Sequence, residues 1–218
     1  SYINEIANLC ELVGADIHDV ASAMGQDGRI SDKFLHPGPG FGGSCFPKDL
    51  ESLVAISKEN NLSMETLNAA INANKNQKII MCHKLKKLIK NGIKGKNIAI
   101  LGLSFKANTD DIRESASINI INFILEEGGI VRAHDPIAND SMSKLFSDIL
   151  YFKDVYEAID GADALVIMTE WNEFRSLDLA RIKKIMKGPY VLDTRNILNM
   201  IELSRLGFIY DNVGRIKN

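Results

Sequence analysis

The sequence contains little cysteine, proline or tryptophan: three cysteines, five prolines and one tryptophan occur among 218 residues. Cys10, Cys45 and Cys82 are odd in number and lack metal-ligand spacing, so neither a disulfide framework nor a zinc site is indicated. No apolar run reaches transmembrane length and the first residues carry no signal-peptide pattern, so we expect a cytoplasmic protein without membrane contact. The formal net charge of -2 argues against nucleic acid as a partner.

The composition that remains is that of a globular protein. Hydrophobic residues make up 45% of the chain and charged residues 25%, enough for one large or two small cores. The sequence shows no internal repeat and no low-complexity tract. Apolar residues recur at helical spacing directly after Ser1, so we expect a truncated chain that is entered partway along a helix. Gly14 is expected to end this helix as a C-terminal cap, and Asp16 can start a second one.

Residues 34–50, FLHPGPGFGGSCFPKDL, gather four glycines and three prolines around Cys45. An apolar-periodic segment follows, which predicts a helix that begins near the cysteine. Ser44 is a candidate N-cap, and Pro47 is tolerated in a first turn because its missing N–H would have had no partner there. The pattern therefore predicts a loop that delivers one thiol to a helix start.

This placement has chemical consequences for Cys45. Unpaired amides, the helix dipole and the nearby Lys48 would stabilise a thiolate, the nucleophilic form of cysteine. Asp49 lies one turn further on the same helix face, where a carboxylate can hold a water molecule next to a group bound to sulfur. The alternative interpretation is a buried structural cysteine at the end of a flexible loop. The charged neighbours favour the nucleophile, whereas Cys10 and Cys82 fall in helical patterns and are interpreted as core residues.

The chain has two parts with different patterns of apolar residues, and together they predict an α/β protein. Helices are expected over about 1–13, 17–24, 45–60 and 63–90, and the last is long enough to form a spine or a dimer contact. From Lys96 onward, short apolar strands alternate with helices, which predicts a doubly wound parallel sheet. We therefore expect an all-helical domain at 1–93 and a Rossmann-like domain at 94–218, divided near 91–96 where Gly92 and Gly95 interrupt the pattern.

The loop after the first strand is GLSFKAN rather than the G-x-G-x-x-G of a dinucleotide site. Phe105 and Lys106 stand where small residues would let the backbone approach a pyrophosphate, so NAD is not expected in this second domain. A nucleotide bound through side chains fits better, with Lys106 on a phosphate or sugar hydroxyl and Arg195 at the same sheet edge. Taken alone, such basic residues are more often solvated surface groups.

Three other residues have two interpretations each. His134 and Asp135 close a predicted strand and are interpreted as turn chemistry rather than catalysis. Trp171 follows another apolar strand, where it would either stack on a base or fill the space between domains.

Three long motifs occur in a fixed order: GFGGSCFPKD with PGPG before it, GLSFKANTDDIRES at 102–115, and TEWNEF at 169–174. In these motifs the chain resembles the UDP-glucose/GDP-mannose dehydrogenase family of nucleotide-sugar 6-dehydrogenases. The resemblance implies a central helical domain that carries the cysteine and the dimer interface, followed by a Rossmann-like domain that binds UDP. It also implies that the family's N-terminal NAD-binding domain is absent and that its catalytic Lys and Asn fall upstream of Ser1.

The resemblance implies an NAD-dependent enzyme, with the cysteine motif most similar to members that oxidise UDP-glucose to UDP-glucuronate. In this family a cysteine traps the aldehyde, a second hydride leaves, and water cleaves the thioester. Cys45 would be the nucleophile and Asp49 would support the hydrolytic water. Cys45, Lys48 and Arg113 would contact NAD, which the missing domain would mainly hold. The 218 residues alone are therefore expected to be inactive.

The resemblance also implies a substrate pocket and a homodimer formed through the central helices. Arg29 would reach the substrate of the neighbouring subunit. The residues that would line the UDP-sugar pocket are Phe34, Leu35, His36, Pro37, Gly38, Phe41, Gly42, Lys106 and Arg195.

Alternatives remain open at this point. Within the family, the chain could instead resemble GDP-mannose or UDP-N-acetylmannosamine dehydrogenases. Outside it, a nucleotide-binding and dimerisation module without chemistry is possible. A thiol redox protein is the weakest alternative, because no resolving cysteine lies near Cys45.

Overall fold

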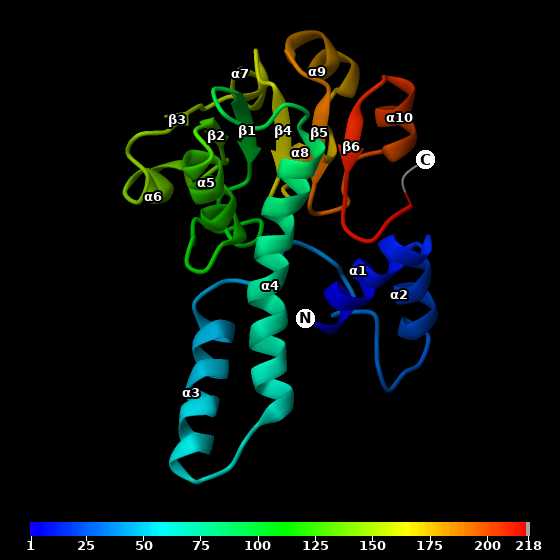
Figure 1. Ribbon diagram of the computed structural model, residues 1–218, viewed down its shortest axis with the longest axis vertical. Helices are drawn as coiled ribbons and strands as arrows, with labels where there is room; N and C mark the ends of the chain where they lie inside the picture. Colours follow the sequence, from blue (N-terminus) through cyan, green and yellow to red (C-terminus); the bar gives the residue numbers. More distant parts are fainter. Residues whose placement is uncertain (217–218) are drawn as a thin grey trace.

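Four helices occupy the first part of the chain in the computed structural model, which describes residues 1–216 (Figure 1). Gly14 ends the first helix in the left-handed conformation at φ 73°, and Asp16 caps the second by accepting the amide of His18. Both features were predicted from the sequence, and both are confirmed. The four helices are α1 (Tyr2–Val13), α2 (Ile17–Gly25), α3 (Cys45–Glu59) and α4 (Glu65–Leu88).

The remainder of the described chain is a six-stranded sheet with helices between the strands. All strand pairs are parallel and the order is β3-β2-β1-β4-β5-β6, the order of a Rossmann-like doubly wound sheet. The predicted α/β fold class is therefore confirmed. The elements are β1 (Asn97–Leu101), α5 (Ala116–Glu126), β2 (Ile130–His134), α6 (Asn139–Ser143), β3 (Leu150–Tyr151), α7 (Val155–Ile159), β4 (Ala164–Ile167), α8 (Asn172–Arg175), α9 (Leu179–Ile185), β5 (Tyr190–Asp193), α10 (Met200–Arg205) and β6 (Ile209–Asp211).

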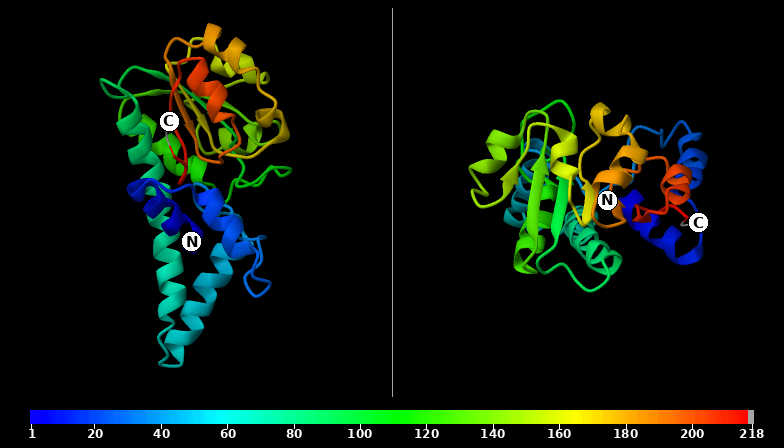
Figure 2. Two further views of the ribbon diagram at one scale, coloured as in Figure 1. Left: turned by 90° about the vertical axis from the view of Figure 1, so that its right-hand side faces the viewer. Right: turned by 90° about the horizontal axis from the view of Figure 1, so that it is seen from above.

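The sheet separates two cores because alternate residues of each strand point to opposite faces. Ile98 and Ile100 of β1 face α4 and α5, whereas Ala99 and Leu101 face α7, α8 and α9. Figure 2 shows helices on both sides of the sheet. Because both faces are covered, the central strands β1 and β4 are buried almost throughout and read as continuous apolar runs.

Helix α4 connects the two parts of the molecule. Its 24 residues span about 36 Å at 1.5 Å per residue. Its first half packs against α3 in a hairpin that projects away from the sheet, and its second half lies along the sheet (Figure 1). Met81, Cys82 and Leu85 of that second half are buried. Cys10 is also buried, so both cysteines interpreted as core residues do lie in the core.

A tight turn separates α4 from β1. Asn91, Gly92 and Gly95 all adopt left-handed φ values between 66° and 77°, a conformation that favours glycine and asparagine. The turn falls where the sequence predicted the boundary between two domains. Among the helices of residues 1–216, none combines the length and the apolarity that a bilayer-crossing helix requires.

The segment after β6 returns to the first two helices. Lys84 of α4, 9% exposed, pairs with Glu11 of α1 at 2.6 Å and with Asp211 of β6 at 3.1 Å. The other carboxylate oxygen of Glu11 accepts the amide of Gly214, and Arg215 pairs with Asp16 at the start of α2. These ion pairs join α1, α2 and α4 to the end of the sheet.

Candidate functional site

Cys45 is the first residue of α3 and its side chain is exposed. Ser44 occupies the N-cap position but has helical angles, φ -85° and ψ -30°, and its side chain makes no capping hydrogen bond. The predicted capping by Ser44 is therefore wrong: its hydroxyl lies 3.7 Å from the Cys45 sulfur instead. The predicted delivery of an accessible thiol to a helix start is confirmed.

Lys48 and Asp49 are also exposed, in the first turns of α3. Asp49 stands four residues after Cys45, so the two side chains share a helix face. An open hollow of about 400 Å³ adjoins the start of α3 on the side of Lys48, and neither Cys45 nor Asp49 is among the residues that line it. Its lining is Gly43, Ser44, Pro47, Lys48, Glu51, Arg113 and Glu114. The structure thus gathers Lys48 and Arg113, which belong to two different motifs, around one hollow that reaches Ser44, the neighbour of Cys45.

Two glycines let the cysteine loop run directly against the second motif. A Cβ on Gly42 would overlap the carbonyl oxygen of Glu114, and one on Gly43 would lie 2.9 Å from the ring of Phe105. Gly43 itself adopts φ 89° and donates its amide to the carbonyl of Arg113 at 2.8 Å. A side chain at position 42 would force the backbone of Glu114 to move, whereas one at position 43 would displace the Phe105 ring and be strained at φ 89°. This close contact explains the Gly-Gly pair before Ser44.

Arg113 is held by its neighbour in sequence. Its guanidinium, 68% exposed, makes two hydrogen bonds to Asp111, at 2.9 and 2.8 Å. The pKa of Arg113 is raised mainly by its hydrogen bonds to Asp111. The nearby Cys45 sulfur raises it further. The same pairing holds the pKa of Asp111 below its ordinary value. A fixed cation therefore stands close to the thiol.

A buried polar face of α4, with one asparagine of α1, holds the loop before Cys45. Asn74 accepts the amide of Phe41 at 2.8 Å and donates to its carbonyl at 3.0 Å. Gln77 donates to the carbonyl of Gly38, whose amide is accepted by Asn4. Sequence reasoning missed these groups. Their only signal was three polar residues at helical spacing, Asn74, Gln77 and Lys78, on a helix that is otherwise apolar on this side.

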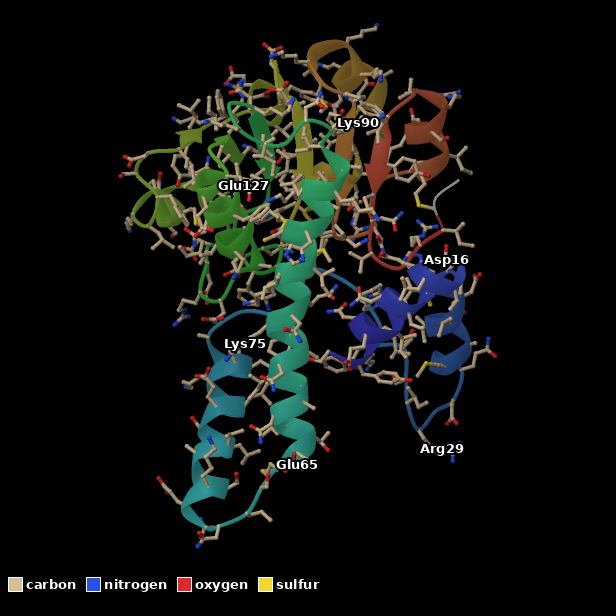
Figure 3. The ribbon with its side chains drawn as sticks, in the orientation of Figure 1. Asp16, Arg29, Glu65, Lys75, Lys90 and Glu127 are labelled. Atoms are coloured by element: carbon tan, nitrogen blue, oxygen red, sulfur yellow. The ribbon has the colours of Figure 1, made fainter. Side chains whose placement is uncertain are left out.

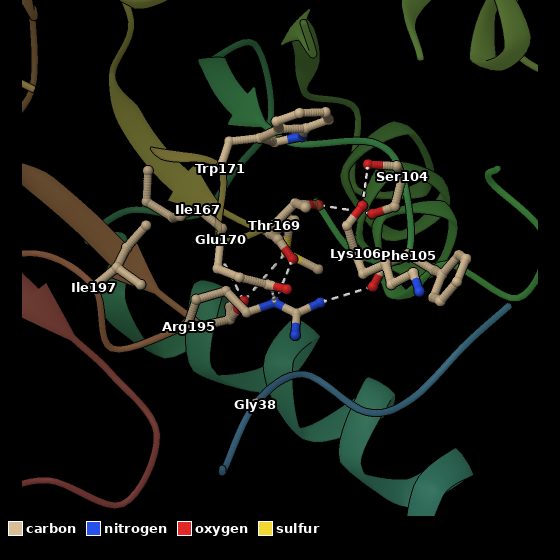
Figure 4. A network of polar contacts seen from close by, with 12 residues as sticks. Gly38, Ser104, Phe105, Lys106, Ile167, Thr169, Glu170, Trp171, Arg195 and Ile197 are labelled. Atoms are coloured by element: carbon tan, nitrogen blue, oxygen red, sulfur yellow. Dashed lines mark hydrogen bonds and ion pairs between the residues drawn. The ribbon is translucent and has the colours of Figure 1, made fainter. Parts of the chain in front are cut away.

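The loop of residues 34–38 has mixed exposure. Phe34 is 92% exposed, whereas the side chain of Leu35 belongs to the core. Leu35, His36 and Pro37 also form one wall of a second hollow, of about 490 Å³, against α2. Gly38 lies beneath the Arg195 guanidinium (Figure 4), where a Cβ would sit 3.5 Å from Nη1. Only part of the predicted pocket lining is therefore gathered at the sheet edge.

Arg195 organises that edge, as Figure 4 shows. Its Nε donates to the carbonyl of Met168 at 2.8 Å and lies 3.2 Å from a carboxylate oxygen of Glu170, while Nη2 donates to the carbonyl of Phe105. Burial lowers the pKa of Arg195, and the carboxylates of Glu170 and Asp193 counteract this effect. The side chain is 18% exposed, and its Nε and Nη2 both serve the protein itself.

Lys106 differs from Arg195 because it is exposed, and its amine lies 5.3 Å from the centre of the Phe105 ring. Phe105 thus touches both halves of the site: its ring packs on Gly43, and its carbonyl binds Arg195. These loops follow β1, β4 and β5 at their carboxyl ends, where the strand order reverses between β1 and β4. Ligands of doubly wound sheets bind at such a switch point.

Buried residues of the third motif, TEWNEF at 169–174, support this edge of the sheet. Thr169 donates its hydroxyl to the carbonyl of Ser104, and Gly102 approaches the Thr169 backbone so closely that a Cβ would lie 2.6 Å from its amide. Trp171 is buried in the core beneath β4 and donates to Asp135, so it does not fill the space between the two predicted domains. Asp135 also accepts the amides of Leu103, Ser104, Ile137 and Ala138, which confirms its interpretation as turn chemistry.

Arg29 stands apart from the groups described so far. It lies at the outer tip of the loop after α2 (Figure 3), where its side chain is 89% exposed and pairs with Asp27. Within this chain it contacts neither the cysteine nor the sheet edge. In the described part of the molecule, no group of three potential metal ligands gathers at any site.

Comparison with known proteins places these motifs in context. Residues 1–76 match the central-domain model of the UDP-glucose/GDP-mannose dehydrogenase family, and residues 99–200 match the UDP binding domain model of the same family. The chain is 44% identical over 216 residues to a UDP-glucose 6-dehydrogenase of Rickettsia bellii (strain RML369-C), covering 98% of this chain and 50% of that protein. It is 45% identical over 215 residues to the UDP-glucose 6-dehydrogenase of Rhizobium meliloti (strain 1021), covering 99% and 49%.

A solved structure gives the same result. The UDP-glucose dehydrogenase of Pyrobaculum islandicum superposes with a TM-score of 0.85 at 31% identity, covering 98% of this chain and 47% of that one. The chain thus spans about half the length of the curated relatives it matches. Two domain models of one family match in order along most of its length, and the chain belongs to the UDP-glucose/GDP-mannose dehydrogenase family.

Proposed function

We propose that this chain is the nucleophile-bearing and UDP-sugar-binding part of an NAD-dependent UDP-glucose 6-dehydrogenase. One observation carries the proposal: an exposed cysteine at a helix start lies next to Arg113 and Lys48, and Phe105 joins this cluster to a sheet edge bearing Lys106 and Arg195. The relatives at 44% and 45% identity are named UDP-glucose 6-dehydrogenases, which supports the same substrate here. The product would be UDP-glucuronate.

The chemistry proposed for Cys45 is covalent. After the C6 alcohol has been oxidised to an aldehyde, the thiolate adds to the aldehyde carbon and gives a thiohemiacetal. Loss of a hydride from that carbon gives a thioester. A water molecule held by Asp49 then attacks the thioester carbon, the carbon–sulfur bond breaks, and a carboxylate and the free thiol result. Bound NAD would accept one hydride in each of the two oxidations.

The residues near Cys45 suit one edge of such a cofactor. Lys48 and Arg113 present two cations to the open hollow, although Glu51 and Glu114 also line it. Cys45, Lys48 and Arg113 would be the cofactor contacts of this chain. The loop after β1 lacks the dinucleotide fingerprint, and Gly38 to Gly43, which do spell G-x-G-x-x-G, follow a loop rather than a strand. We therefore expect the 218 residues alone to produce no NADH from UDP-glucose.

The nucleotide would occupy the switch point of the sheet. Lys106 offers an exposed ammonium to a phosphate or sugar hydroxyl, and the remaining Arg195 donor, Nη1, faces Gly38. In this proposal residues 1–93 carry the cysteine and the dimer contacts, and residues 94–218 bind UDP. The sugar would extend from the sheet edge toward Cys45, along Phe41 and Gly42. The loop of residues 34–38 would complete the pocket.

A homodimer through the central helices is part of the proposal. Leu12 and Val13 of α1 are 84% and 67% exposed, and Leu53 and Ile56 of α3 are 45% and 55% exposed. Large exposed apolar patches mark interaction sites, and the proposal assigns these four residues to the contact between two copies. Arg29, at the outer tip of the loop after α2, is suited to reach the substrate of a second copy. A cytoplasmic location fits both the substrate and the free thiols.

Two alternatives differ in a measurable way. GDP-mannose or UDP-N-acetylmannosamine would be the substrate if the base or sugar preference departs from that of the relatives. A non-catalytic nucleotide-binding and dimerisation module would bind UDP-sugars equally well, but its cysteine would not react faster than an ordinary thiol.

The proposed nucleotide site is tested by calorimetric titration of the 218-residue chain with UDP, UDP-glucose and GDP-mannose. We expect binding of the two UDP ligands, weakened in Lys106→Met and unchanged in Lys144→Met, which removes an exposed lysine after α6. Arg195 is unsuitable as the main variant because three of its contacts hold the sheet edge together. Tighter binding of GDP-mannose, or equal loss in both lysine variants, would contradict the assignment.

A further inference from the structure

The turn that carries Arg113 is strained and is held by a lysine that the proposed chemistry does not use. Glu114 adopts φ 54°, in the left-handed region that side chains other than Gly, Asn and Asp rarely occupy. Such a conformation persists only where surrounding contacts enforce it. Lys78 of α4 donates its ammonium to the Glu114 carbonyl at 2.9 Å and pairs with the Glu114 carboxylate at 3.1 Å.

The position of Lys78 is unusual for a lysine. Its side chain is only 7% exposed, and a buried ammonium is tolerated only when its donors find acceptors. Both acceptors described here belong to Glu114, which makes this residue the anchor of the buried charge. Lys75, three residues earlier on the same helix, lines two further hollows together with Lys78, one beside Ile118 and one beside Phe41, but Lys75 is exposed.

Lys78 also touches the cysteine loop from the other side. Its Cγ lies 3.2 Å from the place of a Cβ on Gly40, and the carbonyl that it binds is the one against which Gly42 packs. One residue further along the cysteine loop, the Gly43 amide donates to the Arg113 carbonyl. This hydrogen bond joins the loop to the Arg113–Glu114 turn. One buried cation therefore contacts both segments that meet at the thiol.

We propose that Lys78 is a positioning residue, whose buried ammonium fixes the Arg113–Glu114 turn against the cysteine loop and so sets Arg113 beside Cys45. This inference rests on the proposed function, in which Arg113 and Cys45 act together. Lys78 itself does not reach the hollow beside Cys45 and takes no part in bond making. Its effect on the thiol passes through the backbone of Glu114.

The test compares four variants of the 218-residue chain: Lys78→Met, Arg113→Met, the double variant, and Lys75→Met as the matched control. The first readout is the rate at which iodoacetamide alkylates Cys45 at pH 7, followed by peptide mass. We expect Lys78→Met and Arg113→Met to slow the reaction by the same factor, roughly threefold, the scale of one partly exposed charge interaction. The double variant should be no slower than Arg113→Met, because both changes remove one effect.

The second readout is amide hydrogen exchange. In Lys78→Met the Gly43 amide, which binds the Arg113 carbonyl, should exchange faster, whereas the Phe41 amide, which binds Asn74, should keep its protection. Lys78→Arg, which keeps a cation, should restore the Gly43 rate. If Lys78→Met does not fold, Lys78→Gln, which removes the charge but keeps a polar side chain, takes its place in both readouts with the same expected results.

The outcomes separate the two proposals. A lower urea midpoint in Lys78→Met with unchanged alkylation and unchanged Gly43 exchange would mean that Lys78 is only structural, and would overturn this inference. Additive slowing in the double variant would overturn it too. If Arg113→Met leaves the alkylation rate unchanged while Gly43 exchange rises in Lys78→Met, then Lys78 does fix the Arg113–Glu114 turn against the cysteine loop. In that case the proposed pairing of Arg113 with Cys45 fails instead.

Discussion

The backbone of Gly42 lies in direct contact with the backbone of Glu114, so that a Cβ on Gly42 would stand 2.8 Å from the Glu114 carbonyl carbon and overlap its oxygen. This contact joins the cysteine loop to the turn that carries Arg113. Gly42 and Glu114 belong to two different motifs, which thereby form one site. The contact depends on the absence of a side chain at one position, and that makes it easy to probe.

Gly42→Ala should destabilise the chain by about 1–3 kcal/mol, because the added methyl forces two backbone segments apart. Gly28→Ala is the matched control: it lies in an open loop with nothing within 4 Å of its Cβ position, and we expect a change of less than about 0.5 kcal/mol. Urea denaturation of both variants measures the difference. Equal stability of the two would show that the loop moves freely relative to Glu114.

Cys45 should be the only cysteine that iodoacetamide modifies in the folded chain near neutral pH. Cys10 and Cys82 are buried, and burial raises the pKa of both thiols, that of Cys82 to about 11. Both therefore stay protonated and shielded. Peptide mass mapping after brief treatment gives the site, and the same treatment in urea should modify all three. Modification of Cys82 at the rate of Cys45 in the folded chain would contradict the packing of α4 against α5.

Lys84→Met should cost about 3 kcal/mol, because it leaves the carboxylates of Glu11 and Asp211 without the cation they share. Lys86→Met, two residues further on the same helix, removes a lysine that is 54% exposed and paired with Glu127. We expect the control to cost less than about 1 kcal/mol. The free energies of unfolding from urea titration decide between them. A small effect at Lys84 would mean that the segment after β6 is not held by this pair.

The pairing of Asp111 with Arg113 should weaken in acid. Because the pKa of Asp111 is lowered in the folded chain, its stabilising contribution is present above the unfolded value of about 3.9 and is lost as the pH falls through the folded value. Carboxyl NMR titration should place the Asp111 midpoint below about 3.9, and Arg113→Gln should move it up. A midpoint that ignores Arg113→Gln would mean that the two hydrogen bonds do not form in solution.

The homodimer proposal predicts that Leu12→Asp weakens self-association by more than tenfold, because it places a charge in an apolar contact. Ile137→Asp is the control, since Ile137 is another apolar residue, 52% exposed, on the sheet part of the molecule. Sedimentation equilibrium measures both dissociation constants. A monomeric parent chain, or equal weakening by both changes, would count against a dimer through the central helices.

The sequence was sufficient for the features that depend on local chemistry. Apolar spacing predicted the four helices and the change to alternating strands near Lys96, and Gly14 and Asp16 marked helix ends correctly. These predictions succeeded because caps, turns and periodicity act over a few residues. The one local error, at Ser44, has the same origin: cap preference is a tendency of about 1 kcal/mol, and the Gly-Gly loop pinned by Phe105 and Glu114 sets the backbone there instead.

The tertiary structure decided which residues meet. Nothing in the spacing of Lys48 and Arg113 shows that they line one hollow, and no periodicity separates Lys106, which is free to bind a ligand, from Arg195, which mainly serves the sheet edge. The polar face of α4 was equally hidden, because Asn74, Gln77 and Lys78 read as an ordinary solvated stripe until the loop and the Glu114 turn are placed against it. The sequence by itself determined the elements and the placement of Cys45 at a helix start. Long-range packing chose the partners, because the contacts that close this site join residues far apart along the chain.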